Sequence, residues 1–166
     1  TIKITNTSKI ETNAKIAEQL GIILNPVETS LEESKYATIG FPSETRVFNK
    51  CRETGNFGRQ IISASVKSGI GEEFQEPNIE NFFFNKYMFS KAIEQGEELN
   101  IIAKPYEAPY KVADLIFAYS DSYCFVNPPD FIEEEIINLA PKNLNISSNE
   151  NLCLKDSIIV CFGKTG

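Results

Sequence analysis

The chain has three arginines, and all of them fall within one stretch of 14 residues, at Arg46, Arg52 and Arg59. The other 13 basic residues are lysines. A guanidinium is a rigid fork of N–H donors that grips a carboxylate or phosphate at two points, which lysine cannot do. If Arg46 and Arg59 face each other across a β-hairpin, they can share one anion. The clustering therefore predicts an anion-binding site on this hairpin.

Other side chains are placed to complete such a site. Ser63 and Ser65 alternate with Arg59 along one predicted strand, so their hydroxyls share a face with its guanidinium. Lys50 or Lys67 could add positive charge, and Tyr87 belongs to an aromatic segment that would form an apolar wall. We therefore expect a small anionic ligand, such as a carboxylate. The predicted ligand-binding residues are Arg46, Arg59, Ser63, Ser65 and Tyr87.

The same arginines have a plainer explanation. They can pair with nearby acids such as Glu44 and Glu53 on an exposed sheet face, where an ion pair contributes about 0–1 kcal/mol and implies no function. The alternative hypothesis is then a non-enzymatic structural or interaction subunit. Its partner would be another protein or a second copy of this chain. Whether the protein is an enzyme stays open on the sequence.

The four cysteines, Cys51, Cys124, Cys153 and Cys161, form no Cys-x-x-Cys pair. Their spacing suits neither a zinc knuckle nor a redox motif, so we expect four unpaired thiols that act as small apolar side chains in a reducing cytoplasm. Two sequons, at Asn6 and Asn145, leave secretion open. A second alternative function is a cysteine-dependent enzyme. Its nucleophile would be Cys51, because the flanking Lys50 and Arg52 favour the thiolate.

Composition excludes several classes of function. The chain of 166 residues contains no histidine, which rules out Ser-His-Asp and Cys-His catalysis within it. The formal net charge of −7 disfavours nucleic acid as a partner. The glycine-rich segment 65–71 lacks the order of a P-loop or a dinucleotide fingerprint, so we expect no cofactor and no metal. No apolar run approaches the roughly 20 residues that span a bilayer, and no membrane insertion is expected.

Alternation of apolar and polar residues predicts the strands that would position the arginines. The hairpin joins strands over 45–51 and 57–67 through a glycine-containing loop at 52–56. Further strands are predicted over 1–5, 36–41, 99–104, 111–119, 123–126 and 157–162. A tight turn at Ser120-Asp121 would make a second hairpin from the strands 111–119 and 123–126.

Three helices are predicted. One spans 13–20, and a second spans 79–95, with apolar residues around most of its circumference. The third spans 131–139, with Asp130 as its cap and Glu133 as the capping-box partner. Short turns between most strands favour an α+β fold over a doubly wound α/β fold. We therefore expect one domain over 1–166, a mostly antiparallel sheet of about seven strands packed against two or three helices.

Overall fold

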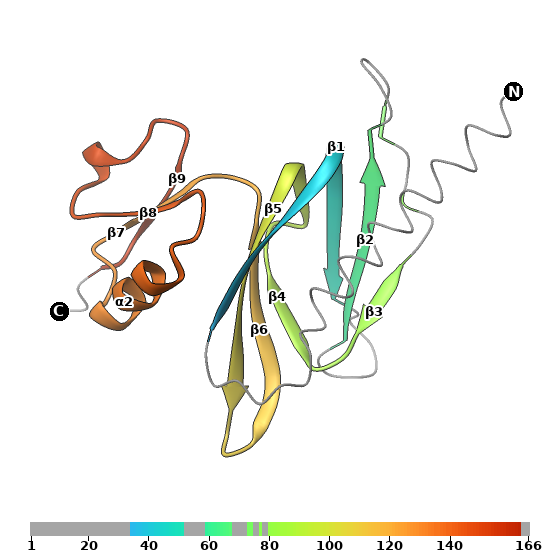
Figure 1. Ribbon diagram of the computed structural model, residues 1–166, viewed down its shortest axis with the longest axis horizontal. Helices are drawn as coiled ribbons and strands as arrows, with labels where there is room; N and C mark the ends of the chain where they lie inside the picture. Colours follow the sequence, from blue (N-terminus) through green and yellow to red (C-terminus); the bar gives the residue numbers. More distant parts are fainter. Residues whose placement is uncertain (1–33, 52–58, 68–72, 75–76, 78–79, 164–166) are drawn as a thin grey trace, which may run out of the picture.

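The computed structural model describes residues 34–51, 59–67, 73–74, 77 and 80–163. The strand predicted over 1–5, the helix over 13–20 and the hairpin loop at 52–56 lie outside these residues. Two β-sheets and one α-helix make up the described part of the chain (Figure 1). The described residues are therefore mostly β, and they contain one helix where the α+β prediction places two, over 79–95 and 131–139.

The larger sheet has six strands in the order β3-β2-β1-β5-β6-β4 and curls into a half-barrel (Figure 1). All its strands pair antiparallel except β4, which runs parallel to β6. The register of β1 against β5 shifts between Gly40 and Thr45, where Pro42 interrupts the ladder, and such bulges bend a strand. Its strands are β1 Lys35–Cys51, β2 Gln60–Val66, β3 Asn81–Phe83, β4 Lys86–Phe89, β5 Ile93–Glu107 and β6 Lys111–Tyr119.

The curl brings β4 back toward β2, across an opening that no strand ladder closes in the described residues. Side chains bridge this seam instead. The Asn49 side-chain amide donates to the Met88 carbonyl at 3.4 Å, and the Met88 backbone N–H donates to Gln60 Oε1 at 3.4 Å. Asn49 also donates to Ser90 Oγ at 2.9 Å. Polar side chains therefore stand in for backbone pairing along the seam.

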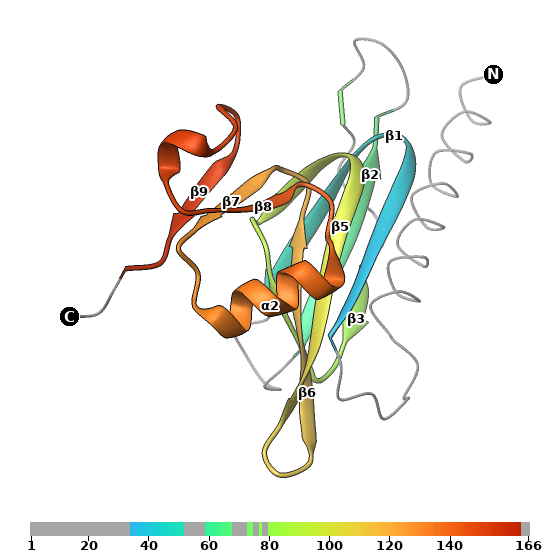
Figure 2. The ribbon, with the colours of Figure 1, turned by 60° about the vertical axis from the view of Figure 1, so that its left-hand side comes forward.

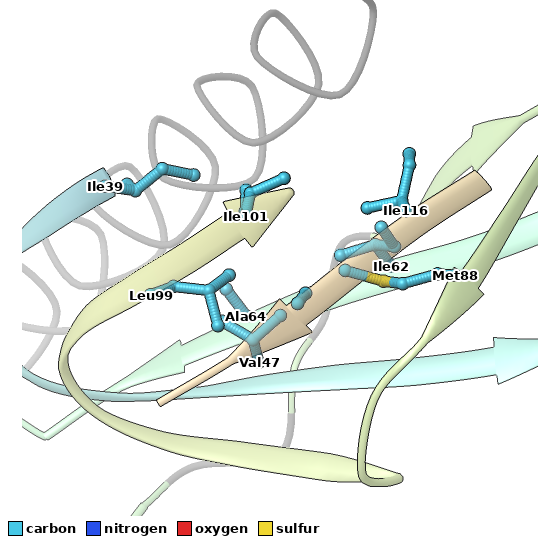
Figure 3. Packing of buried hydrophobic residues seen from close by; sticks show 9 residues of the cluster. Ile39, Val47, Ile62, Ala64, Met88, Leu99, Ile101 and Ile116 are labelled. Atoms are coloured by element: carbon cyan, nitrogen blue, oxygen red, sulfur yellow. The ribbon is translucent and has the colours of Figure 1, made fainter. Parts of the chain in front are cut away.

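The inner face of the half-barrel holds the main apolar core (Figure 3). Because side chains alternate along a strand, one register places an apolar face inward from β1, β2, β4, β5 and β6. The apolar cluster consists of Ile39, Val47, Ile62, Ala64, Met88, Leu99, Ile101, Ile116 and Ala118.

A smaller sheet of three parallel strands, in the order β8-β7-β9, stands beside the half-barrel (Figure 2). A second apolar cluster joins the two sheets, since Tyr119 of β6 packs with Ile136 and Leu144. Tyr119 is fully buried, and its hydroxyl donates to the Lys142 carbonyl at 2.8 Å. The elements of this part are β7 Tyr123–Val126, α2 Asp130–Leu139, β8 Leu144–Ser147, the 3-10 turn η1 Glu150–Leu152 and β9 Ile158–Cys161.

The helix predicted over 79–95 is wrong, because this segment forms β3, β4 and the start of β5. Aromatic residues fit a pleated strand, and the chain turns between β3 and β4 at Asn85, whose φ is 55°. The apolar residues that would surround a helix on all sides instead lie on the two faces of these strands. Met88 points into the half-barrel core, while Phe82 and Phe89 stay exposed.

Three smaller expectations are also corrected. The strand at 123–126 is confirmed, but β7 pairs parallel with β8 and β9, so no hairpin joins it to β6. Helix α2 is confirmed, yet Asp130 is its first residue and no side-chain hydrogen bond caps it. A disulfide joins Cys124 and Cys153, so these two are not free thiols. The two sulfurs meet because η1 returns the chain to β7, a proximity that spacing does not reveal.

Candidate functional site

The structure separates the two arginines that the sequence places together. On the β1–β2 ladder, Arg46 lies opposite Ser65. Arg59 precedes β2, six residues before Ser65, which at about 3.3 Å per residue is roughly 20 Å along the strand. One anion cannot bridge that distance. Arg46 and Arg59 therefore belong to two different places on the sheet.

Arg46 is held in one orientation by two contacts. Its Nε donates to Gln95 Oε1 at 2.7 Å, since Gln95 lies opposite it on β5. Its guanidinium carbon lies 3.9 Å from the centre of the Phe74 ring, a cation–π contact. The Nζ of Lys67 lies 5.7 Å from the same ring. A ring and an amide thus fix the guanidinium, and neither contact neutralises its charge.

Glu44 connects the other polar groups beside Arg46. Lys67 Nζ donates to Glu44 Oε2 at 2.9 Å, and the Gln95 side-chain amide donates to Glu44 Oε1. The Lys67 and Gln95 hydrogen bonds hold the pKa of Glu44 below its ordinary value. Backbone pairing fixes the same two segments, because the Lys67 N–H donates to the Glu44 carbonyl at 2.9 Å. Lys67 and Glu44 therefore cancel each other's charge.

These side chains surround a hollow of about 470 Å³, which we call the Arg46 hollow. Its volume lies within the range of about 300–1,000 Å³ typical of small-molecule sites. It is lined by Arg46, Lys67, Glu73, Phe74 and Gln95.

Arg59 has an environment of its own. Its guanidinium carbon lies 4.3 Å from the centre of the Phe82 ring and 5.5 Å from that of Phe84. Its Nε is buried and makes no hydrogen bond among the described residues. Phe82 and Phe84 are both exposed at the β3 edge of the sheet. Arg59 therefore stacks on an aromatic surface and does not line the Arg46 hollow.

The remaining predicted ligand-binding residues do not line the hollow either. Ser63 and Ser65 share the face of β2 that pairs with Arg46 and Phe48, but their relative exposures are only 3% and 0%. Tyr87 lies on β4, opposite Leu115 of β6. Because Lys86 and Met88 are buried on the inner face, Tyr87 points to the outer face.

Cys51 lies at the exposed end of β1, where its Sγ donates to Gln60 Oε1 at 3.5 Å. That partner is an uncharged amide. Lys50, the adjacent residue, points to the opposite face of the strand. Among the described residues, no general base contacts the thiol, so the geometry adds nothing to the cysteine-enzyme hypothesis.

A charged pair is buried inside the half-barrel. Lys86 Nζ lies 3.4 Å from Asp114 Oδ2, and the two side chains are 8% and 12% exposed. Asp114 Oδ1 also accepts from Lys111 at 2.9 Å. Burial lowers the pKa of Lys86, and the neighbouring Asp114 opposes this shift. Within the described part of the chain, no cluster of three metal-ligating acids or cysteines occurs.

The β5–β6 hairpin projects beyond the rest of the sheet, as Figures 1 and 2 show. The pairing with β1 ends at Ala103, and the pairing with β4 begins at Asp114. Between them, residues 104–113 form a two-stranded arm, which we call the β5–β6 arm. Its relative exposures are 51% at Tyr106, 82% at Tyr110 and 49% at Val112.

Sequence reasoning finds Arg46 and Lys67 but misses the rest of the hollow. Gln95 belongs to the segment mistaken for a helix, and only the β1–β5 register brings it to Arg46. Phe74 and Glu73 follow β2 in the chain, and no local pattern marks them as partners of Arg46. A predicted pairing of β1 with β5 that set the amide of Gln95 opposite Arg46 would have indicated this part of the site.

Comparison with known proteins identifies no relative: no family model, no curated protein and no solved structure matches the chain. No helix in the described residues is long and apolar enough to cross a membrane. Indications of function therefore come from the geometry of the chain itself.

Proposed function

We propose that the protein binds a small carboxylate-bearing molecule in the Arg46 hollow. The observation that carries this proposal is the environment of Arg46: its contacts with Gln95 and Phe74 orient the guanidinium, and it makes no direct ion pair among the described residues. Gln95 accepts a hydrogen bond from Nε of Arg46 only, so the two terminal nitrogens of the guanidinium can donate to a ligand carboxylate. Preorganisation of this kind reduces the entropy lost on binding.

This proposal narrows the arginine-hairpin hypothesis to one arginine. The hollow is open and its charges nearly balance, since Arg46 and Lys67 face Glu44 and Glu73. Affinity must then come from the directed N–H donors of Arg46 and much less from the overall field. A planar carboxylate fits such a fork better than a multiply charged phosphate, which the two acids would repel.

The test is Arg46→Lys, which keeps the charge and removes the fork. We expect small carboxylates such as acetate, benzoate and 4-methylpentanoate to shift amide NMR signals around β1 and β5 in the parent protein. The substitution should weaken binding about ten-fold, the value of one lost charge-assisted hydrogen bond.

Arg59→Lys is the matched comparison, because it makes the same change at the other stacked arginine. We expect it to leave carboxylate affinity unchanged. Equal losses in both variants would favour one shared site, as in the hairpin hypothesis. Binding that survives Arg46→Lys undiminished would contradict the proposal.

A second candidate function is protein interaction through the β5–β6 arm. Two exposed tyrosines and a valine on an arm that no third strand flanks in the described residues favour it, because tyrosine supplies large and rigid contact area in interfaces. The simplest partner is a second copy of the chain. This candidate does not compete with the Arg46 hollow, because the hollow lies at the start of β5 and the arm at its end.

A further inference from the structure

Two charged side chains of the Arg46 hollow, Arg46 and Glu73, make no direct ion pair in the described part of the protein. Arg46 contacts only an amide and a ring, both uncharged. Glu73 is exposed, lines the same hollow, and takes part in none of the described ion pairs. Arg46 and Glu73 do not pair with each other either. One positive and one negative group thus face the same space without meeting.

The other charges of the hollow are already matched. Lys67 donates to Glu44 at 2.9 Å, and Gln95 links Glu44 to Arg46. A ligand that displaced Lys67 from Glu44 would break a pair the protein makes for itself. A ligand that bridges Arg46 and Glu73 gains two new contacts and breaks none in the described network. The hollow therefore offers a ligand one positive group, Arg46, and one negative group, Glu73.

We infer that the ligand is zwitterionic, of the α-amino acid class. Its carboxylate would bind the guanidinium of Arg46, and its ammonium group would bind the carboxylate of Glu73. The inference rests on the proposed carboxylate-binding function and adds the second contact. It also explains why an acid lines a carboxylate site: Glu73 would repel a simple anion, and it attracts a molecule that carries an ammonium group beside its carboxylate.

The size of the hollow agrees with this class. About 470 Å³ accommodates a ligand of amino-acid size. The apolar surface of the hollow comes from Phe74, one region of whose ring is covered by Arg46. Polar groups outnumber apolar ones among the described lining residues, so the ammonium and carboxylate groups of an amino acid, more than its side chain, would be recognised.

The test compares matched ligands that differ only in the amino group. L-phenylalanine, L-leucine and L-serine are titrated beside 3-phenylpropanoate, 4-methylpentanoate and 3-hydroxypropanoate, with NMR shifts as the readout. We expect each amino acid to bind at least ten-fold more tightly than its deaminated partner. In Glu73→Gln this preference should disappear, while the affinity for the deaminated acids stays equal or rises.

Glu97→Gln is the matched control, because Glu97 is another exposed acid, on β5, and does not line the hollow. It should keep the preference for amino acids. If both ligand series bind equally to the parent protein, or if the preference survives Glu73→Gln, the zwitterion inference is overturned while carboxylate binding stands. If neither series binds, both the inference and the proposed function fail.

Discussion

At the scale of single residues, the buried Lys86–Asp114 pair carries the largest expected energetic effect. Taking two charges out of water is costly, and their attraction offsets this cost only while both remain. Lys111 contributes a second contact to Asp114 but is itself 41% exposed. Asp114 is therefore the residue on which the buried ammonium of Lys86 depends.

We expect Asp114→Asn to lower the free energy of unfolding by about 3 kcal/mol at neutral pH, because it leaves Lys86 charged and unpaired. The pKa of Lys86 is lowered in the folded protein, so the unfolded chain binds more protons in the range between that pKa and 10.5. The contribution of Lys86 to the free energy of unfolding therefore rises with pH across this range. The substitution lowers the folded pKa further, and its cost should shrink toward alkaline pH.

Urea denaturation at neutral pH and near the ordinary pKa of lysine measures this effect. Lys111→Gln is the control, with an expected loss below about 1 kcal/mol, because Lys111 is partly in water. A cost for Asp114→Asn that is small, or that does not change with pH, would mean that Lys86 is neutral or well hydrated.

Residue identity predicts part of the site and residue proximity decides the rest. Arg46 and Lys67 are recognisable because guanidinium and ammonium groups can bind anions in any fold. Glu73 and Gln95 are common surface residues whose role depends on which strand lies beside which. Arg59 lies apart from Arg46, because the chemistry of a guanidinium does not say where along a strand it sits.

At the scale of elements, local patterns succeed where one segment determines its own structure. The strand predicted over 111–119 matches β6, and the one over 123–126 matches β7. Helix α2 starts within one residue of its prediction. The prediction for the segment 79–95 is wrong because its strands are short and the chain turns at Asn85. Neither the helical period of about 3.6 residues nor the strand period of two continues long enough to decide between them.

The β5–β6 arm gives an element-scale prediction. If the arm docks on a second copy, the sedimentation mass should rise with protein concentration, and Tyr110→Ser should lower that association without changing the thermal unfolding midpoint. Added salt should strengthen association, because it screens the repulsion between chains of net charge −7.

Phe131→Ser is the matched control, since Phe131 is also an exposed aromatic residue, 69% accessible, but lies on α2. It should leave the association unchanged. A protein that stays monomeric at every concentration, or that associates equally after Tyr110→Ser, would exclude self-association through the arm.

At the scale of the whole molecule, the Cys124–Cys153 bond ties η1 back to the centre of the smaller sheet across a sequence separation of 29 residues. A loop of that length stabilises a fold by about 3–4 kcal/mol through the entropy of the unfolded chain. The enclosed segment contains α2 and β8, so its loosening would expose the apolar cluster shared with β6.

We expect Cys153→Ser to lower the free energy of unfolding by about 3 kcal/mol in protein refolded under oxidising conditions. Cys161→Ser, at an exposed unpaired thiol, should change it by less than about 0.5 kcal/mol. Denatured but unreduced parent protein should show two reactive thiols, Cys51 and Cys161. Four reactive thiols under these conditions would contradict the disulfide.

The global arrangement of strands was the least predictable feature. Short connections favoured antiparallel neighbours, which is correct for most of the half-barrel and wrong for all three strands of the smaller sheet. Parallel pairing of β7 with β8 and β9 needs crossovers that a list of local elements does not order. The curl of the six-stranded sheet likewise depends on contacts between strands that are not neighbours in it, such as Met88 of β4 with Gln60 of β2.

The pairing of β1 with β5 has a consequence for how the protein is made. Lys35 pairs with Ala103, which is added to the chain 68 residues later, whereas β2 follows β1 closely. At about 5–20 residues per second, a ribosome takes roughly 3–14 s to cover that distance. After β2 is made, residues 45–51 of β1 have their hairpin partner, but β1 still lacks β5, and Ile39 and Val47 lack the core into which they pack. The nascent chain thus passes through a period in which an apolar strand edge is open, and slower translation lengthens it.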